Sequence, residues 1–214
     1  MSAASEKEQI EALGKWWKEN GSSIITGLLL GVSILLGGKA WFNYQDTQVQ
    51  NASNIYSQMM VSSQSRMLEQ ARTHANELIS NYTDSTYAPL AALLLARLAV
   101  QDGKLGAAQG QLQWALDHAT SPQLENTARL RLVRVLIAQQ QYAQAEKLLA
   151  SVIDAGAYAY LYAELEGDLA AAQNQLQQAA TAYKKALDAS PAQAPNRGLL
   201  TAKYENISGT GVTE

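Results

Sequence analysis

Few residues of this chain have the types and spacings that catalysis or metal binding requires. Its two histidines, His74 and His118, have no carboxylates beside them at ligand spacing. There is no cysteine, no HExxH, no GxSxG and no phosphate-binding loop ending in Gly-Lys-Ser/Thr. Glu164, Glu166 and Asp168 form an acidic cluster, which a solvated helix face explains better than a metal site with rigidly held oxygen ligands. We therefore predict a non-enzymatic protein without metal or cofactor.

The composition is typical of a helical scaffold. The chain has 214 residues, of which 47% are hydrophobic and 16% charged, with four prolines and a net charge of −3. This length suits one domain with an appendage. The near-neutral charge argues against a nucleic-acid partner, because nucleic-acid binders normally carry a basic patch. No stretch shows the sustained alternation of a strand, so the predicted fold class is all-α.

An apolar segment near the N-terminus is long enough to cross a bilayer. Residues 21–38 carry no charge, and the apolar character continues to residue 42, which gives about 20 residues, the thickness of a bilayer core. Trp17 before the segment and Trp41 after it are the amphipathic rings that membrane interfaces select. We predict a single transmembrane helix over residues 21–42.

A cleaved signal peptide is the alternative interpretation of this segment. Gly38 and Ala40 form a small-x-small pattern that resembles a cleavage site. However, the preceding region is long and contains four glutamates, whereas a signal peptide begins with a short basic region. The pattern therefore favours a retained anchor.

The basic residues predict the orientation of the anchor. Three lysines precede the span, and after Lys39 the next basic residue is Arg66. Because the flank richer in lysine and arginine stays in the cytoplasm, residues 1–20 are predicted to be cytoplasmic and the larger part to be exported. In a Gram-negative bacterium this is a single-pass inner-membrane protein with a periplasmic domain, where a chain without cysteine avoids oxidation.

Two further patterns lie in and before the span. Ile10, Leu13 and Trp17 recur at helical spacing, which fits either a short amphipathic helix on the inner leaflet or a helical extension of the span. Gly27 and Gly31 form a GxxxG pair, which permits close approach of a second membrane helix. The pair therefore predicts a helix-packing face and allows a homodimer.

The exported part contains internal repeats. Gly167, Ala179, Tyr183, Ala186 and Pro191 have the spacings of a tetratricopeptide unit, in which small residues let two antiparallel helices approach. The alanine of this unit recurs at earlier positions in near-constant phase. These alanines are Ala145, Ala108 and, more faintly, Ala71. The chain is therefore predicted to form a tetratricopeptide-like solenoid of helical hairpins.

The repeat phase defines the predicted boundaries. The repeat domain is expected over residues 43–195, and residues 196–214 are expected to form a cap and tail. Within the domain, helix pairs are predicted at about 89–122, 126–159 and 160–193, with a weaker pair at about 45–85 that is continuous with or follows the membrane helix.

The concave face of such a solenoid is the candidate binding surface. In tetratricopeptide units the first helix of each pair usually lines this face, and the repeat phase places Arg97, Arg134 and Asp168 at equivalent positions there. Gln101 and Glu164 share the face. We predict partner binding by these five residues, with two arginines and an acidic cluster giving the groove opposite charge at its two ends. Ordinary solvated charges are the alternative.

The opening segment also resembles a known family. The segment IEALGKWWKENGSSIITGLLLGVSILLGGKAWFNYQ is followed by ASNIYSQMM and then by the repeats, a pattern similar to the YfgM family of ancillary subunits of the bacterial Sec (SecYEG) translocon. The resemblance covers nearly the whole chain. It implies an inner-membrane protein with one span and a periplasmic repeat domain. It also implies two partners, the Sec translocon subunits and a membrane-anchored periplasmic chaperone that resembles prolyl isomerases.

The expected function is therefore that of an adaptor. The resemblance implies that the protein passes translocated polypeptides to periplasmic chaperones. The alternative is a structural homo-oligomeric envelope protein without clients, joined through the glycine face and the repeat edges. A signalling role for the cytoplasmic segment 1–19 is a third hypothesis. Co-purification of Sec subunits distinguishes the adaptor from the structural oligomer.

Overall fold

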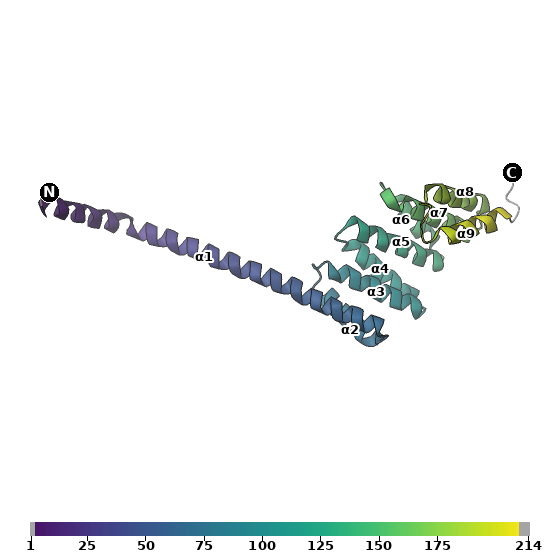
Figure 1. The fold of residues 1–214 in the computed structure, drawn as a ribbon, viewed down its shortest axis with the longest axis horizontal. Helices are drawn as coiled ribbons and strands as arrows, with labels where there is room; N and C mark the ends of the chain where they lie inside the picture. The colour runs from purple at the N-terminus through teal and green to yellow at the C-terminus, as the bar shows by residue number, and fades with distance from the viewer. Residues whose placement is uncertain (1–2, 210–214) are drawn as a thin grey trace. The chain divides into compact units, whose positions relative to one another are not determined.

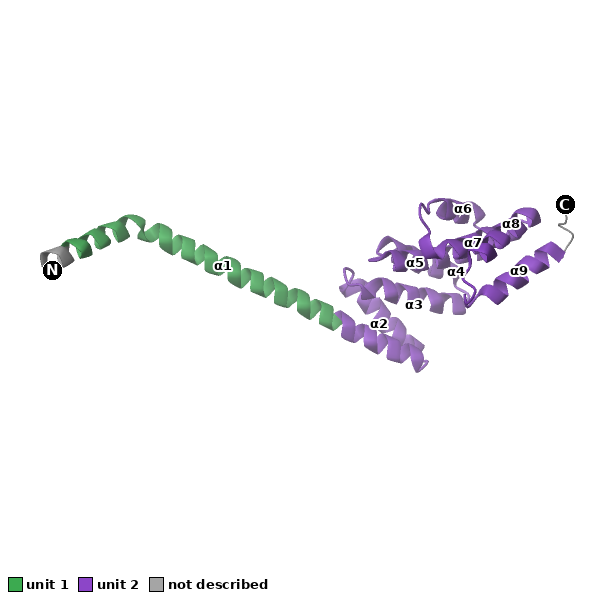
Figure 2. Ribbon diagram, turned by 45° about the horizontal axis from the view of Figure 1, so that its top comes forward, with its two compact units in different colours: residues 1–51 green, residues 52–214 purple. Residues whose placement is uncertain are grey.

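The computed structural model describes residues 3–209, with side chains from residue 8 onward, and this part of the chain is helical with no strand. The expected all-α class is confirmed. The chain divides into an N-terminal unit, residues 1–51, and a repeat domain, residues 52–214 (Figure 2). Helix α1 (Ala3–Gln64) contributes to both units.

The described part of the N-terminal unit is a helix whose apolar side chains are mostly exposed. Its most apolar 18-residue window has a mean hydropathy of 1.8 and is only 6% buried. Leu28, Ile34 and Leu35 are each more than 60% exposed. A helix that is apolar on all sides and unburied is suited to lipid rather than water, so this helix is a candidate membrane span.

The repeat domain consists of successive helical hairpins (Figure 1). The end of α1 pairs with α2, and the next three pairs are α3 with α4, α5 with α6, and α7 with α8, before a final single helix. Their bounds are α2 Leu68–Asn81, α3 Tyr87–Gln101, α4 Leu105–Asp117, α5 Pro122–Ala138, α6 Tyr142–Ala150, α7 Ala159–Ala172, α8 Leu176–Ala189 and α9 Arg197–Gly209, with a short 3₁₀ turn at Gly156–Tyr158. The predicted tetratricopeptide-like solenoid is confirmed.

The turn inside each pair repeats one backbone geometry. The second residue after each first helix has a positive φ: Arg66 at 59°, Gly103 at 73°, Gln140 at 60° and Asn174 at 61°. The N–H of the following residue then donates to the carbonyl five residues earlier, at 2.8–2.9 Å. This bond closes the C-terminus of the first helix and turns the chain into the second. The recurrence includes Arg66, so the faint first pair is a true repeat.

Small residues form the contacts between the paired helices. The phase-marking alanines, Ala71, Ala108, Ala145 and Ala179, are each 0% exposed. In the last pair, a Cβ added to Gly167 would lie 2.5 Å from Cε1 of Tyr183, so only glycine allows this ring to pack there. The packing predicted for Gly167 and Tyr183 is confirmed.

The helix boundaries differ from the expected ones where capping decides them. Helix α5 begins at Pro122 rather than near residue 126, because the hydroxyl of Ser121 accepts a hydrogen bond from Leu124 N–H and proline is tolerated in the first turn. Beyond the last pair, α9 continues to Gly209, and Leu200 anchors it in the core at 0% exposure. The rest of the predicted tail, residues 210–214, lies outside the described residues.

Candidate partner-binding groove

Two adjoining pockets form a groove along the first helices of the repeats. The first, of about 330 Å³, lies among α3, α4 and α5, and the second, of about 730 Å³, lies among the end of α1, α3 and the start of α5. They share Leu93, Arg97 and Arg131. We use "the groove" for these two pockets together.

The floor of the first pocket is aliphatic. Leu93, Leu112 and Val135 are less than 8% exposed and come from three different helices. Helix α3 supplies much of this surface because its sequence, YAPLAALLLARLAVQ, is apolar except for Arg97 and its two ends. Val100 at the rim is 45% exposed, so apolar surface remains available to a partner.

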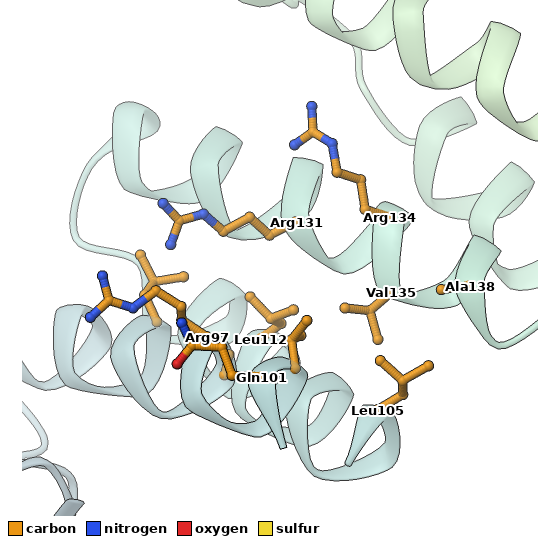
Figure 3. Close-up of a pocket in the computed structure, with 11 residues that line it drawn as sticks. Arg97, Gln101, Leu105, Leu112, Arg131, Arg134, Val135 and Ala138 are labelled. Atoms are coloured by element: carbon orange, nitrogen blue, oxygen red, sulfur yellow. The ribbon is translucent and has the colours of Figure 1, made fainter. Parts of the chain in front are cut away.

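Three arginines form the wall of the groove. The guanidinium groups of Arg97 and Arg131 lie on the same side of the first pocket, and that of Arg134 points away from its floor (Figure 3). Arg97 donates to Ser63 Oγ at 2.9 Å. Among the described side chains, no carboxylate lies within 4.0 Å of any of the three.

This clustering affects the electrostatics of the central arginine. Desolvation at the wall, followed by the positive charges of Arg134 and Arg97, lowers the pKa of Arg131 from its ordinary value. Arginine stays protonated nevertheless, because the guanidinium group is the most basic side-chain group in proteins. The groove therefore carries a concentrated positive charge beside an apolar floor.

The structure brings together three of the five residues predicted to bind a partner. Arg97, Gln101 and Arg134 all line the first pocket. Sequence reasoning missed Arg131, although it stands three residues before Arg134 and so on the same face of α5, a helical spacing that was available to find it.

The other two predicted residues, Glu164 and Asp168, line neither pocket of the groove. They instead hold the last helix. Lys203 Nζ on α9 lies 2.7 Å from Glu164 Oε1 and 2.7 Å from Asp168 Oδ1, and Asn196 donates to Glu164 Oε2 at 2.7 Å. Glu164 is only 3% exposed, so the solvated helix face expected for this residue is wrong. Lys203 supplies the counter-charge that Glu164 needs in order to be buried.

The acidic pair also affects Tyr183. Its hydroxyl donates to Asp168 Oδ1 at 2.8 Å, and burial together with the negative charges of Asp168 and Glu164 raises the pKa of the phenol. Tyr183 is 3% exposed and packs against Gly167, so the carboxylates belong to a packed network between α7, α8 and α9.

The histidines lie apart from the groove. The ring of His118 stacks on Trp114 with centroids 4.0 Å apart. Nδ1 of His74 is 3.9 Å from a carboxylate oxygen of Glu77, so the expectation that His74 has no neighbouring carboxylate is wrong. In the described part of the chain, neither pocket is lined by a histidine or a carboxylate. The groove presents arginine, amide, hydroxyl and aliphatic groups, which suit binding better than proton transfer.

In the candidate span, Gly27 and Gly31 face open space. A Cβ added to either residue meets nothing within 4 Å. Their predicted role in helix packing therefore stays a prediction.

The fold defines a helical-repeat domain with a groove, and a family model described as a tetratricopeptide repeat-like domain matches residues 14–209. Three relatives carry the name "Ancillary SecYEG translocon subunit". The chain is 29% identical to the Escherichia coli protein over 95% of its own length and 97% of the relative's, and 26% identical to the Neisseria gonorrhoeae protein over 94% and 97%. It is 31% identical to the Haemophilus influenzae protein over 69% and 70%. The chain belongs to this family of ancillary translocon subunits. No solved structure matches it.

Proposed function

We propose that this protein is a membrane-anchored, non-enzymatic adaptor at the Sec translocon that binds protein partners through its repeat domain. Its proposed role is to help pass translocated polypeptides to periplasmic chaperones. The observation that carries the proposal is the groove, an apolar floor beside unpaired arginines, in a chain whose relatives are named as translocon subunits. Within the groove we assign partner binding to Arg97, Gln101 and Arg134.

The proposed location follows from the span and its flanking charges. The apolar helix anchors the chain in the bacterial inner membrane, the lysine-rich N-terminus is cytoplasmic, and the repeat domain is periplasmic. Because the chain has no cysteine, single cysteines report the orientation directly. With an impermeant maleimide on intact spheroplasts, we expect labelling of Ser65→Cys and no labelling of Glu8→Cys until the membrane is permeabilised. The opposite pattern would reverse the proposed orientation.

The proposed partners are the Sec translocon subunits and a membrane-anchored periplasmic chaperone resembling prolyl isomerases. Affinity purification of the full chain from membranes in mild detergent, followed by mass spectrometry, tests both. Recovery of Sec subunits and such a chaperone supports the adaptor. Recovery of the protein alone overturns it and favours the structural homo-oligomer of the envelope.

A second sample, with residues 21–42 replaced by an unrelated apolar span, locates the contact. Partners retained by this version bind the repeat domain, and partners lost from it bind the membrane helix. Gly27→Leu with Gly31→Leu tests the proposed packing face, and through it a homodimer. Gly37→Leu is the matched control, because Gly37 also faces open space but lies off the shared face of the pair.

A further inference from the structure

We infer that the groove binds peptide segments in which an Asp or Glu side chain stands next to aliphatic side chains. This inference rests on the proposed function in one respect only, that the groove binds protein. It names the chemistry of the bound segment, which the adaptor role alone does not specify.

The positive charge of the groove favours binding of an anionic group. Arg131 and Arg134 make no hydrogen bond or ion pair with any described side chain, and Arg97 has only the Ser63 hydroxyl. A carboxylate placed between Arg97 and Arg131 can accept hydrogen bonds from both guanidinium groups, whose planar forks match carboxylate geometry. It also reduces the repulsion among three neighbouring cations.

The aliphatic floor of the first pocket favours binding of an aliphatic group beside that anion. Leu93, Leu112 and Val135 leave a space of about 330 Å³, which is at the small end of ligand sites and holds one or two aliphatic side chains. Filling it removes both the floor and the incoming group from water. A fully acidic segment without apolar side chains would contact the arginines and leave the aliphatic floor of the pocket exposed to water.

The length of the groove favours a peptide over a small anion. The second pocket continues from the first across Leu93, Arg97 and Arg131, and Ser121 and Thr127 also line it. The Ser121 hydroxyl accepts from Leu124 N–H and keeps its own proton to donate. The Thr127 hydroxyl donates to the Gln123 carbonyl and keeps a lone pair with which to accept. These remaining hydrogen-bonding positions lie beside apolar side chains and can serve the main chain of an extended segment. A small anion would use the arginines alone and none of this length.

Fluorescence anisotropy with the full chain in nanodiscs of zwitterionic lipid tests the inference. The probes are three terminally blocked, labelled decapeptides: Gly-Ser-Leu-Leu-Glu-Glu-Leu-Leu-Ser-Gly, the same peptide with Gln for Glu, and the same with Ser for Leu. We expect the Glu/Leu peptide to bind about tenfold or more tightly than either other peptide, a difference of about 1.4 kcal/mol or more. The advantage over the Gln peptide should shrink as salt is raised, because the contact is partly exposed.

Two variants assign the effect to the groove. Arg131→Gln should weaken the Glu/Leu peptide about tenfold and leave the weaker binding of the Gln peptide unchanged, which a loss of folding would not do. Lys147→Gln removes the same charge from an exposed position on α6 and should change neither. The inference is overturned if no peptide binds, if the Gln peptide binds as tightly as the Glu/Leu peptide, or if both variants behave alike.

Two further outcomes are informative. Vesicles of anionic phospholipid that displace the Glu/Leu peptide in an Arg131-dependent manner would assign the arginines to a lipid surface and overturn the inference. The adaptor proposal is tested separately, because recovery of Sec subunits by the Arg131→Gln variant would leave it standing when the peptide preference fails.

Discussion

Lys203 is expected to be the largest single electrostatic contributor to the stability of the last repeat. Lys203→Met removes the ammonium group that lies 2.7 Å from Glu164 Oε1 and 2.7 Å and 2.9 Å from the two oxygens of Asp168. Glu164 would keep only the hydrogen bond from Asn196, and Asp168 only that from Tyr183.

The magnitude follows from the burial of each partner. Breaking a fully buried ion pair by removing one member costs about 3–5 kcal/mol, because the remaining charge stays buried. The Glu164 side chain is 4% exposed, but those of Lys203 and Asp168 are 26% and 22% exposed, so water reaches part of the network. We therefore expect Lys203→Met to lower the free energy of unfolding by about 2–3 kcal/mol.

Urea unfolding of the full chain in detergent, followed by circular dichroism, measures this loss. Hydrogen exchange should locate it, with protection lost first in α9 and the facing turns of α7. Lys184→Met is the matched control, because Lys184 is 65% exposed and 4.0 Å from Asp188, and it should cost less than about 0.5 kcal/mol. Adding Glu164→Gln to Lys203→Met should recover most of the loss. A loss from Lys203→Met as small as that of the control would refute the reasoning.

The same network predicts a pH dependence. Burial alone would lower the pKa of Lys203, but the hydrogen bonds and charges of Asp168 and Glu164 raise it above its ordinary value. A raised lysine pKa gives stability that is fully present below about pH 10.4 and is lost as pH rises through the folded-state pKa. The raised pKa of Tyr183 acts in the same direction, because the unfolded phenol ionises first. The free energy of unfolding should therefore fall above about pH 10, and less steeply in Lys203→Met.

Two backbone predictions concern the repeats themselves, and the same unfolding experiment measures both. Gly167→Ala should lower the free energy of unfolding by about 2 kcal/mol or more, because the added Cβ meets the buried ring of Tyr183. Gly110→Ala is the control and should be neutral or stabilising, because its added Cβ meets nothing within 4 Å. Equal effects of the two substitutions would contradict the packing argument. Gln140→Gly should raise the free energy of unfolding by about 0.5–1 kcal/mol, because glycine adopts the positive φ of this position without strain. Gly103→Ala should lower it by about 1 kcal/mol, because alanine is strained at the positive φ of Gly103. Changes of the same sign would contradict this explanation of the turns.

The repeat fold could be predicted because packing small residues is periodic in sequence. The alanines at 71, 108, 145 and 179 recur every 37, 37 and 34 residues, and the positive-φ turn residues keep the same spacing. The turn geometry itself could not be predicted, since only Gly103 of the four turn residues is a glycine. The helix termini impose the left-handed conformation on Arg66, Gln140 and Asn174 through the bonds that close them.

The candidate site was only partly predictable because charge pairing is a long-range property. Glu164 and Asp168 are separated from Lys203 by 39 and 35 residues, and no local pattern shows that α9 folds back to bring the ammonium group to them. The expected polarity along the groove assumed that these carboxylates were free. By contrast, Arg97 and Arg134 occupy equivalent positions in consecutive repeats, so the repeat phase alone was sufficient to place both beside one pocket.

The two charged clusters have opposite consequences for the folded protein. Around Lys203, carboxylates and an ammonium group are buried together, so the charges stabilise the chain without any partner. In the groove, Arg131 lies near Arg97 and Arg134, and like charges held together destabilise the free protein. The chain has more acidic than basic residues, 19 against 16, yet no described carboxylate lies within ion-pair distance of these arginines. Local features that lower the stability of the free protein are expected at sites where a bound ligand stabilises the same residues. This is the reason for which the proposed binding role is assigned to the arginines of the groove rather than to the acidic cluster.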